Sequence, residues 1–224
     1  MKKIIALFLV AIMALSFAAC SSGLPGLPNT ATKETAFDVA KQAYEKIDVA
    51  YEITEKFGSD VYEAWRMGIY DDDEILADGV GYLAANLSLS ESDIIAGVAL
   101  FLADDKENPE SIDRKTANLC FKYFEDSLFS FCILVVSNAY EANGKAAEAQ
   151  AALDSAKELM KKMSEQYSDY EHYPKLKEYY TTTKSYFAFC QSPTGSFEQI
   201  KNTINDYRNE ARNCVSDLDY IFED

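Results

Sequence analysis

The segment "SFEQIKNTINDYRNEARNCVSDLDYI", residues 196–221, decides the fold. Its apolar and aromatic side chains recur at alternating intervals of three and four residues, and they are Phe197, Ile200, Ile204, Tyr207, Ala211, Cys214, Leu218 and Ile221. This spacing places them on one face of an α-helix that packs against its neighbours at about +20°. Because the pattern persists to the end of the segment, it predicts an antiparallel helical bundle.

Two preceding segments repeat this spacing. One runs from Ala146 to Tyr167 and the other from Leu176 to Cys190. No segment alternates apolar and polar residues as a half-buried strand does. Proline occurs only at positions 25, 28, 109, 174 and 193, so long stretches contain no helix breaker. We therefore expect an all-α fold, an antiparallel bundle of six to eight helices over residues 33–224.

The first half of the chain gives weaker helix boundaries. We expect a first helix from near Lys33, with an interruption at Gly58. Ser90 and Asp93 have the spacing of a capping box, which starts a helix. A long helix is expected to begin at 108–110, where Asn and Pro favour a helix start, and to end at 143–144, where Gly favours a stop.

The acidic run at 71–74, "DDDE", has two interpretations. Its carboxylates suit the start of a helix, where they accept hydrogen bonds from the free N–H groups and interact favourably with the helix dipole. Calcium binding is the alternative. An EF-hand loop counted from Asp71 would need Gly at the sixth position and Glu at the twelfth, but Leu76 and Tyr82 stand there. The sequence therefore favours helix capping.

The segment "AYEANGKAAEAQAALDSA", residues 139–156, resembles the middle of a tetratricopeptide repeat. The matching residues are Tyr140, Gly144, Ala149, Leu153 and Ala156. The resemblance covers about 133–161, but Ile133 and Lys161 depart from the repeat at its two ends, and we find no second copy. It implies a tight helical hairpin and leaves tetratricopeptide-like packing open for the C-terminal half, without a peptide-binding groove.

The N-terminus has the form of an export signal. Two lysines precede an apolar run, Ile4–Phe17, which would span about 21 Å as a helix, less than a bilayer core of roughly 30 Å. The four residues Phe17–Cys20 resemble the lipobox of bacterial lipoproteins. The resemblance implies that residues 1–19 are a signal peptide, that Cys20 is lipidated, and that the domain faces outward from a bacterial membrane, in the periplasm or at the cell surface. A plain secretory signal with a chance cysteine is the alternative.

The composition narrows the partners of this domain. Residues 20–32 are rich in Ser, Gly and Pro, and are expected to form a flexible tether. Cleavage before Cys20 would remove Lys2 and Lys3 from 21 basic residues, leaving 19 against 37 acidic ones and a net charge of −18. This balance disfavours nucleic acid, whose binding requires clustered Lys and Arg. We expect the lipid anchor to be the contact with the membrane.

Four cysteines remain for the domain. We expect Cys120 and Cys132 to share one helix, about 18 Å apart along its axis, too far for a disulfide. In an up-and-down bundle Cys120 and Cys214 would lie at similar heights, which favours that pair and leaves Cys132 with Cys190 open. Four buried free thiols are the alternative. No C-x-x-C spacing supports a metal site, and we expect neither a metal nor a cofactor.

The functional candidates are aromatic. His172 is the only histidine, and no phosphate-binding or zinc-helix motif occurs, so an enzyme would have to use carboxylates, tyrosines or a cysteine. Two clusters supply candidate contacts for a protein, peptide or glycan: Tyr62, Trp65, Arg66 and Tyr70, then Tyr179 and Tyr180. Packing at the edge of the core is the alternative for both. We expect a non-catalytic binding module, and a hydrolase-type enzyme working in an inter-helix cleft is the rival.

Overall fold

The structure, a computed structural model, describes residues 35–103, 105 and 107–222. The predicted signal peptide, Cys20 and the tether lie outside these residues. Within them the all-α bundle is confirmed, and no strand is present. The elements are α2 (Ala36–Tyr70), α3 (Asp72–Asn86), α4 (Glu91–Leu102), α5 (Arg114–Tyr123), the short 3-10 helix η1 (Glu125–Ser127), α6 (Leu128–Ala142), α7 (Lys145–Gln166), α8 (Tyr173–Gln191) and α9 (Phe197–Phe222).

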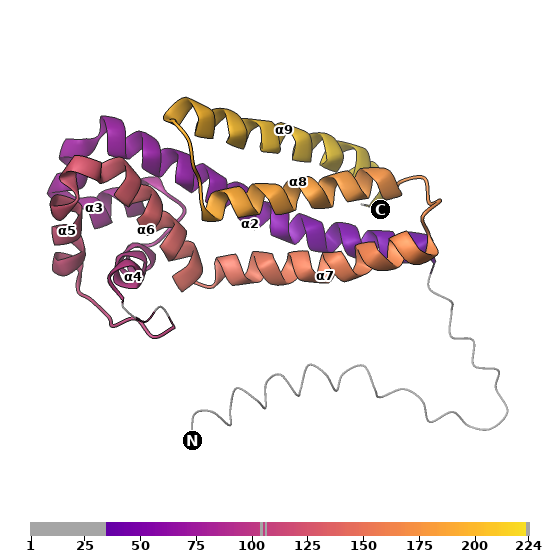
Figure 1. Cartoon of the computed structure of the whole chain (residues 1–224), viewed down its shortest axis with the longest axis horizontal. Helices are drawn as coiled ribbons and strands as arrows, with labels where there is room; N and C mark the ends of the chain where they lie inside the picture. Colours follow the sequence, from indigo (N-terminus) through magenta and orange to yellow (C-terminus); the bar gives the residue numbers. More distant parts are fainter. Residues whose placement is uncertain (1–34, 104, 106, 223–224) are drawn as a thin grey trace, which may run out of the picture. The chain divides into compact units, whose positions relative to one another are not determined.

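Helix α2 organises the domain. It has 35 residues, which corresponds to a length of about 52 Å. Helices α7, α8 and α9 lie along it and alternate in direction, while the shorter helices α3 to α6 gather around the end where α2 finishes (Figure 1). The domain is thus a long antiparallel bundle joined to a compact cluster of short helices, with α2 in both.

The expected interruption of the first helix at Gly58 is wrong, because α2 continues through it. A Cβ at this position would collide with the hydroxyl group of Tyr186, so glycine leaves room for the tyrosine of α8. Capping boxes start two helices. Thr35 and Asp38 form one at α2, and the predicted box of Ser90 and Asp93 is confirmed at α4.

The expected long helix over 108–144 is also wrong. Helix α5 begins after Asp113, whose carboxylate accepts the backbone N–H of Thr116 at 2.7 Å. The chain at Pro109 is a loop, because the side chain that caps the free N–H groups stands four residues later. Helix η1 then separates α5 from α6, so Cys120 and Cys132 lie on different helices.

The turn of the tetratricopeptide-like segment is at Gly144, whose φ of 81° suits glycine. Helices α6 and α7 on either side of it pack far more extensively on α2 than on each other. This packing differs from a tetratricopeptide hairpin, in which the two helices cover each other. The long α2 has taken the place of the partner helix.

The sequence pattern that predicted the bundle matches its core. On α9 the buried residues include Ile200, Ile204, Ala211, Cys214 and Leu218. On α7 and α8 the predicted positions from Ala146 to Met163 and from Leu176 to Cys190 are buried as well. These faces close around α2 and exclude water from the centre of the bundle.

Tyrosines join the helices of the bundle through carboxylates. The hydroxyl of Tyr179 on α8 donates to Asp48 of α2 at 3.0 Å, and Tyr186 donates to Glu55 at 3.3 Å. The guanidinium of Arg208 on α9 also binds Glu55, at 2.8 Å. Burial raises the pKa of both tyrosine hydroxyls, which therefore stay protonated and act as donors.

A buried carboxylate joins α2 to the cluster of short helices. Asp60 accepts the backbone N–H of Ser88 at 3.0 Å, the hydroxyl of Ser88 at 2.7 Å and the hydroxyl of Tyr140 at 2.9 Å. Ser88 lies between α3 and α4, and Tyr140 lies on α6 with its ring stacked on Phe57 at 4.2 Å. One side chain thus holds three segments. Burial raises the pKa of Asp60, although these hydrogen bonds oppose the shift.

We predict that Asp60→Asn and Asp60→Leu separate the charge of this group from its hydrogen bonds. The folded state holds the proton of Asp60 to a higher pH than the unfolded state does. The contribution of Asp60 to stability therefore falls as the pH rises from its ordinary pKa of 3.8 through its raised folded value. Asn removes the charge and keeps an accepting oxygen, so the wild type should lose stability relative to Asp60→Asn as the pH rises above 3.8.

Urea unfolding across this pH range measures both effects. Asp60→Leu leaves the Ser88 and Tyr140 donors without an acceptor and should lower the free energy of unfolding by about 3 kcal/mol near pH 4. This loss should shrink as the pH rises, because the wild type itself loses stability while Leu does not titrate. A difference between wild type and Asp60→Asn that does not change with pH would contradict the assignment.

Candidate functional site

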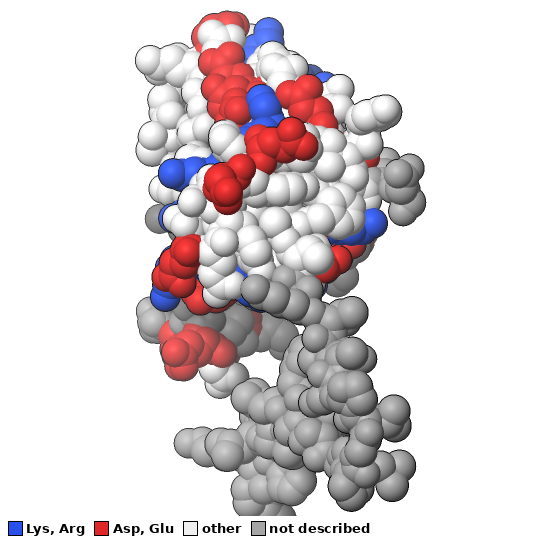
Figure 2. Space-filling view, turned by 90° about the vertical axis from the view of Figure 1, so that its right-hand side faces the viewer, with Lys and Arg blue, Asp and Glu red and all other residues white. Residues whose placement is uncertain are grey.

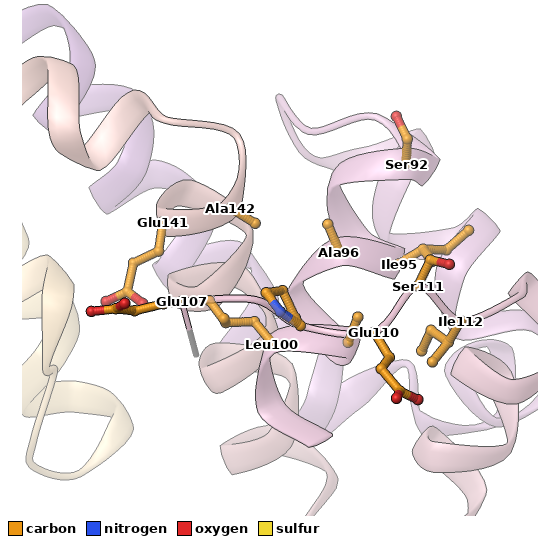
Figure 3. Close-up of a pocket in the computed structure, with 12 residues that line it drawn as sticks. Ser92, Ile95, Ala96, Leu100, Glu107, Glu110, Ser111, Ile112, Glu141 and Ala142 are labelled. Atoms are coloured by element: carbon orange, nitrogen blue, oxygen red, sulfur yellow. The ribbon is translucent and has the colours of Figure 1, made fainter. Parts of the chain in front are cut away.

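The largest described cavity, which we call the α4 cavity, lies between α4, the loop before α5 and the end of α6. Its volume is about 630 Å³, within the range of small-molecule sites. Most of its lining is apolar: Ile95, Ala96, Ala99, Leu100, Pro109, Ile112 and Ala142. The polar side chains that line it are Ser92, Ser111, Glu107, Glu110 and Glu141 (Figure 3).

Two features of α4 shape the cavity. Gly97 brings α4 against α6, because a Cβ there would meet the carbonyl oxygen of Val135. The side-chain amide of Asn138 on α6 donates to the Gly97 carbonyl at 3.3 Å and fixes this contact. Ala96 and Ala99, on the part of α4 that faces the loop, are too small to fill the space left there.

Contacts at the start of α5 fix the end of the loop that leads into this helix. Arg114 forms ion pairs with Asp78 of α3 at 2.5 Å and with Glu91 of α4 at 3.1 Å. Asp78 also accepts the side-chain amide of Asn118 at 2.8 Å, and its backbone departs from helical geometry, which kinks α3. These contacts tie α3, α4 and α5 together beside the cavity.

The charged side chains at the rim of the α4 cavity are all acidic among the residues that the structure describes. Figure 3 shows the carboxyl ends of Glu107 and Glu141 at the same end of the cavity, with Glu110 pointing away on the other side of the loop. No Lys, Arg or His is among its described lining residues. A second cavity of about 380 Å³ adjoins it, sharing Ala99, Glu110 and Ile112, and adds the carboxylate of Asp105.

This arrangement can enclose an apolar molecule and hold a positive charge at its rim. Within the described residues, no group of three or more His, Cys, Asp or Glu side chains is placed to hold a metal ion. The acids of the 71–74 run lie at the start of α3, but the side chain of the N-cap residue Asp71 makes no capping hydrogen bond and pairs with Arg66 at 3.1 Å instead. The arrangement is therefore suited to recognising a ligand by its shape and charge.

The first predicted aromatic cluster packs at the junction of α2, α6 and α9. Tyr62, Trp65 and Tyr70 all contact the ring of Phe197, with centroid distances of 5.6, 6.4 and 6.2 Å. Trp65 is only 6% exposed and also stacks on Phe129 at 5.8 Å, whereas Tyr70 is 66% exposed. The cluster therefore seals the edge of the core, and Tyr70 is its exposed member.

Arg66, the charged member of that cluster, is engaged in ion pairs. It binds Glu63 at 2.7 Å as well as Asp71. In the second cluster Tyr179 is fully buried, so our prediction that it contacts a ligand is wrong. Tyr180 is half-buried and lines a small cavity of about 220 Å³ between α7 and α8.

The buried group closest to an enzyme's machinery is Asp60 with its two hydroxyl partners. Ser88 and Tyr140 line a cavity of about 450 Å³, and their hydroxyls donate to the carboxylate behind them. Both hydroxyls are used to satisfy a buried charge, which gives the group a structural role. His172 lies in the loop between α7 and α8, where it contacts Glu171 at 3.2 Å.

All four cysteines of the domain are free thiols, so none of the predicted pairs is formed. We expected Cys120 and Cys132 on one helix, but η1 separates α5 from α6 and places them on two. Cys120 lies on α5, which packs on α3 and α4, whereas Cys214 lies on α9, which packs on α8 and α2. Burial raises the pKa of Cys132 to about 12 and of Cys214 to about 11.

The domain surface is acidic, as the net charge of −16 for the whole chain requires. Figure 2 shows the end where α7 turns into α8, and red acidic side chains cover more of it than blue basic ones. None of the helices in the described ranges combines the length and the apolar run needed to cross a bilayer.

Comparison of the chain with protein-family models, with curated proteins and with solved structures finds no match. The α4 cavity therefore has to be interpreted from its own chemistry. Sequence reasoning missed it because its lining comes from α4, a loop and the end of α6. The small residues Ala96 and Ala99 on α4 were the available signal.

We predict that the four domain cysteines react with an alkylating reagent at different rates. Cys120 is half-buried, whereas Cys132 and Cys190 are fully buried. Burial raises the pKa of all three thiols. Iodoacetamide should modify Cys120 first, because access and thiolate formation both control the reaction.

Mass spectrometry of peptides from the native, unreduced chain measures this order. After unfolding without reductant, all four thiols should be alkylated. A disulfide-linked peptide containing any two of them would contradict the structure.

Proposed function

We propose that this chain is a lipid-anchored lipoprotein on the outer face of a bacterial membrane, and that its helical domain binds a ligand without catalysing a reaction. The observation that carries the binding role is the α4 cavity, with its apolar lining and acidic rim. The support for the anchor is the resemblance of residues 17–20 to a lipobox after an apolar run.

Several contacts support a preformed site. The floor of the cavity belongs to α4 and α6, which Gly97 and Asn138 hold in close contact. Rigid helices fix the shape of a site more closely than loops do, and a preformed site avoids the entropic cost of ordering it on binding. The loop over 107–112 supplies the other wall and most of the polar groups.

Two polar groups that could act in catalysis, Ser92 and Asp60, are held by other side chains. In the α4 cavity the serine hydroxyl of Ser92 bonds to Ser90 at 2.8 Å, at the start of α4. Asp60, which burial makes a weaker acid, is enclosed by the donors that hold it. A catalytic carboxylate would need its reacting oxygen free for a substrate.

Lipidation at Cys20 has a direct test. Cells expressing the full chain are labelled with radioactive palmitate, and the chain is then separated into membrane and soluble fractions. We expect label and membrane retention in the wild type and the loss of both in Cys20→Ser, because buried acyl chains supply the membrane affinity. Cys120→Ser is the matched control and should keep both. Label retained in Cys20→Ser would contradict the anchor.

The binding role predicts a cavity-filling effect. Nile red, an uncharged apolar fluorophore, should gain fluorescence with the full chain, and Ala96→Phe should abolish the part of this gain that arises in the α4 cavity. Ala151→Phe places the same side chain on the exposed face of α7 and serves as the control. Fluorescence that arises elsewhere is common to all three proteins. Equal fluorescence from Ala96→Phe and Ala151→Phe would contradict the site.

A further inference from the structure

We propose that the α4 cavity selects an organic cation with an apolar body, and that Glu107 and Glu141 recognise its positive charge. The inference rests on the proposed function, since it names the ligand class of the same cavity.

The lining of the α4 cavity specifies two parts of the ligand. The apolar side chains of α4 and the loop, including Ile95, Leu100 and Ile112, favour an apolar body that leaves water on binding. Glu107 lines the cavity from the loop and Glu141 lines it from α6, and Figure 3 draws both carboxyl groups at the same end of the view. Both carboxylates attract a cation placed in the cavity, and no basic side chain is among the described lining residues to oppose this attraction.

The acidity of the cavity is not explained by the acidity of the whole chain. Three other described cavities are lined by lysines: Lys56 and Lys145 near Ser88, Lys115 and Lys122 on α5, and Lys157 and Lys184 between α7 and α8. Basic residues thus reach concave surfaces elsewhere. In the α4 cavity and its neighbour, the charged lining consists of four acids from the described residues: Asp105, Glu107, Glu110 and Glu141.

The shape of the site supports an elongated ligand. The two adjoining cavities share Ala99, Glu110 and Ile112, so an apolar chain can extend from one into the other. Acidic groups that surround a low-dielectric wall focus the electrostatic potential and raise the local concentration of cations. The same potential repels anions, which gives the cavity a selection by sign of charge.

Three probes with the same eight-carbon chain test the selection: n-octylamine, which is protonated at pH 7, 1-octanol, which is neutral, and octanoate, which is an anion. Each competes with Nile red for the full chain at low salt. We expect n-octylamine to displace Nile red at a concentration about ten-fold lower than 1-octanol does. This factor assumes that an ion pair with each of the two carboxylates raises the affinity about three-fold. Octanoate should be the weakest, and added salt should reduce the advantage of n-octylamine.

Variants assign the selection to residues. Glu107→Gln with Glu141→Gln should bring n-octylamine to the level of 1-octanol while leaving 1-octanol unchanged. The matched control is Glu158→Gln with Glu165→Gln, which removes the same charge from exposed positions of α7. The control should keep the full preference. A preference that survives in the Glu107 and Glu141 variant would overturn the assignment.

The outcomes separate the inference from the proposed function. If n-octylamine and 1-octanol displace Nile red equally from the wild type, the cavity binds apolar molecules and the inference on charge is wrong. If Ala96→Phe leaves the fluorescence of Nile red unchanged, the α4 cavity does not bind the dye, and the proposed function is wrong whatever the charge of the ligand.

Discussion

Helix α2 is the constraint on which the rest of the domain depends. Every helix of the long bundle packs on it, and the cluster of short helices is built around its final turns. A helix of this length is stable in water only when other elements cover its apolar face. In the domain that face is divided between two partners, since α7 to α9 cover one part of α2 and α6 covers another. The position of the α4 cavity follows from this division, because α4 packs on the α6 that α2 holds.

The sequence predicted features that depend on one helix alone better than features that depend on contacts between helices. Periodic spacing on α7, α8 and α9 identified their buried faces, because one helix face needs only residues on that helix. The continuity of α2 at Gly58 was missed, because it depends on a contact with another helix. The break at η1 was missed as well. Gly58 is read as a breaker from the sequence alone, and only Tyr186 on α8 explains why a glycine belongs in the helix.

The candidate site follows the same rule. The aromatic residues Trp65 and Tyr179 attracted attention because such side chains are common at interfaces, yet both complete the core. The α4 cavity is marked by small residues and by glutamates that are far apart in the sequence. Such a cavity forms where a helix face has no large side chains, and the spacing of apolar residues in the sequence does not indicate it. The binding role and the preference for cations that we propose for it rest on charge and shape together.

The contacts of α2 also determine the order in which the domain can be completed. Its bonds to Tyr179 and Arg208 join residues separated by 131 and 153 positions in the chain. Helix α2 is made first, but α8 and α9, which cover it, are made last. A growing chain therefore has an amphipathic helix of which only part is covered until α8 and α9 are made, and non-local contacts of this kind slow folding. Until α9 is complete, the part of α2 that it covers stays exposed, and exposed apolar surface of this kind is prone to aggregation.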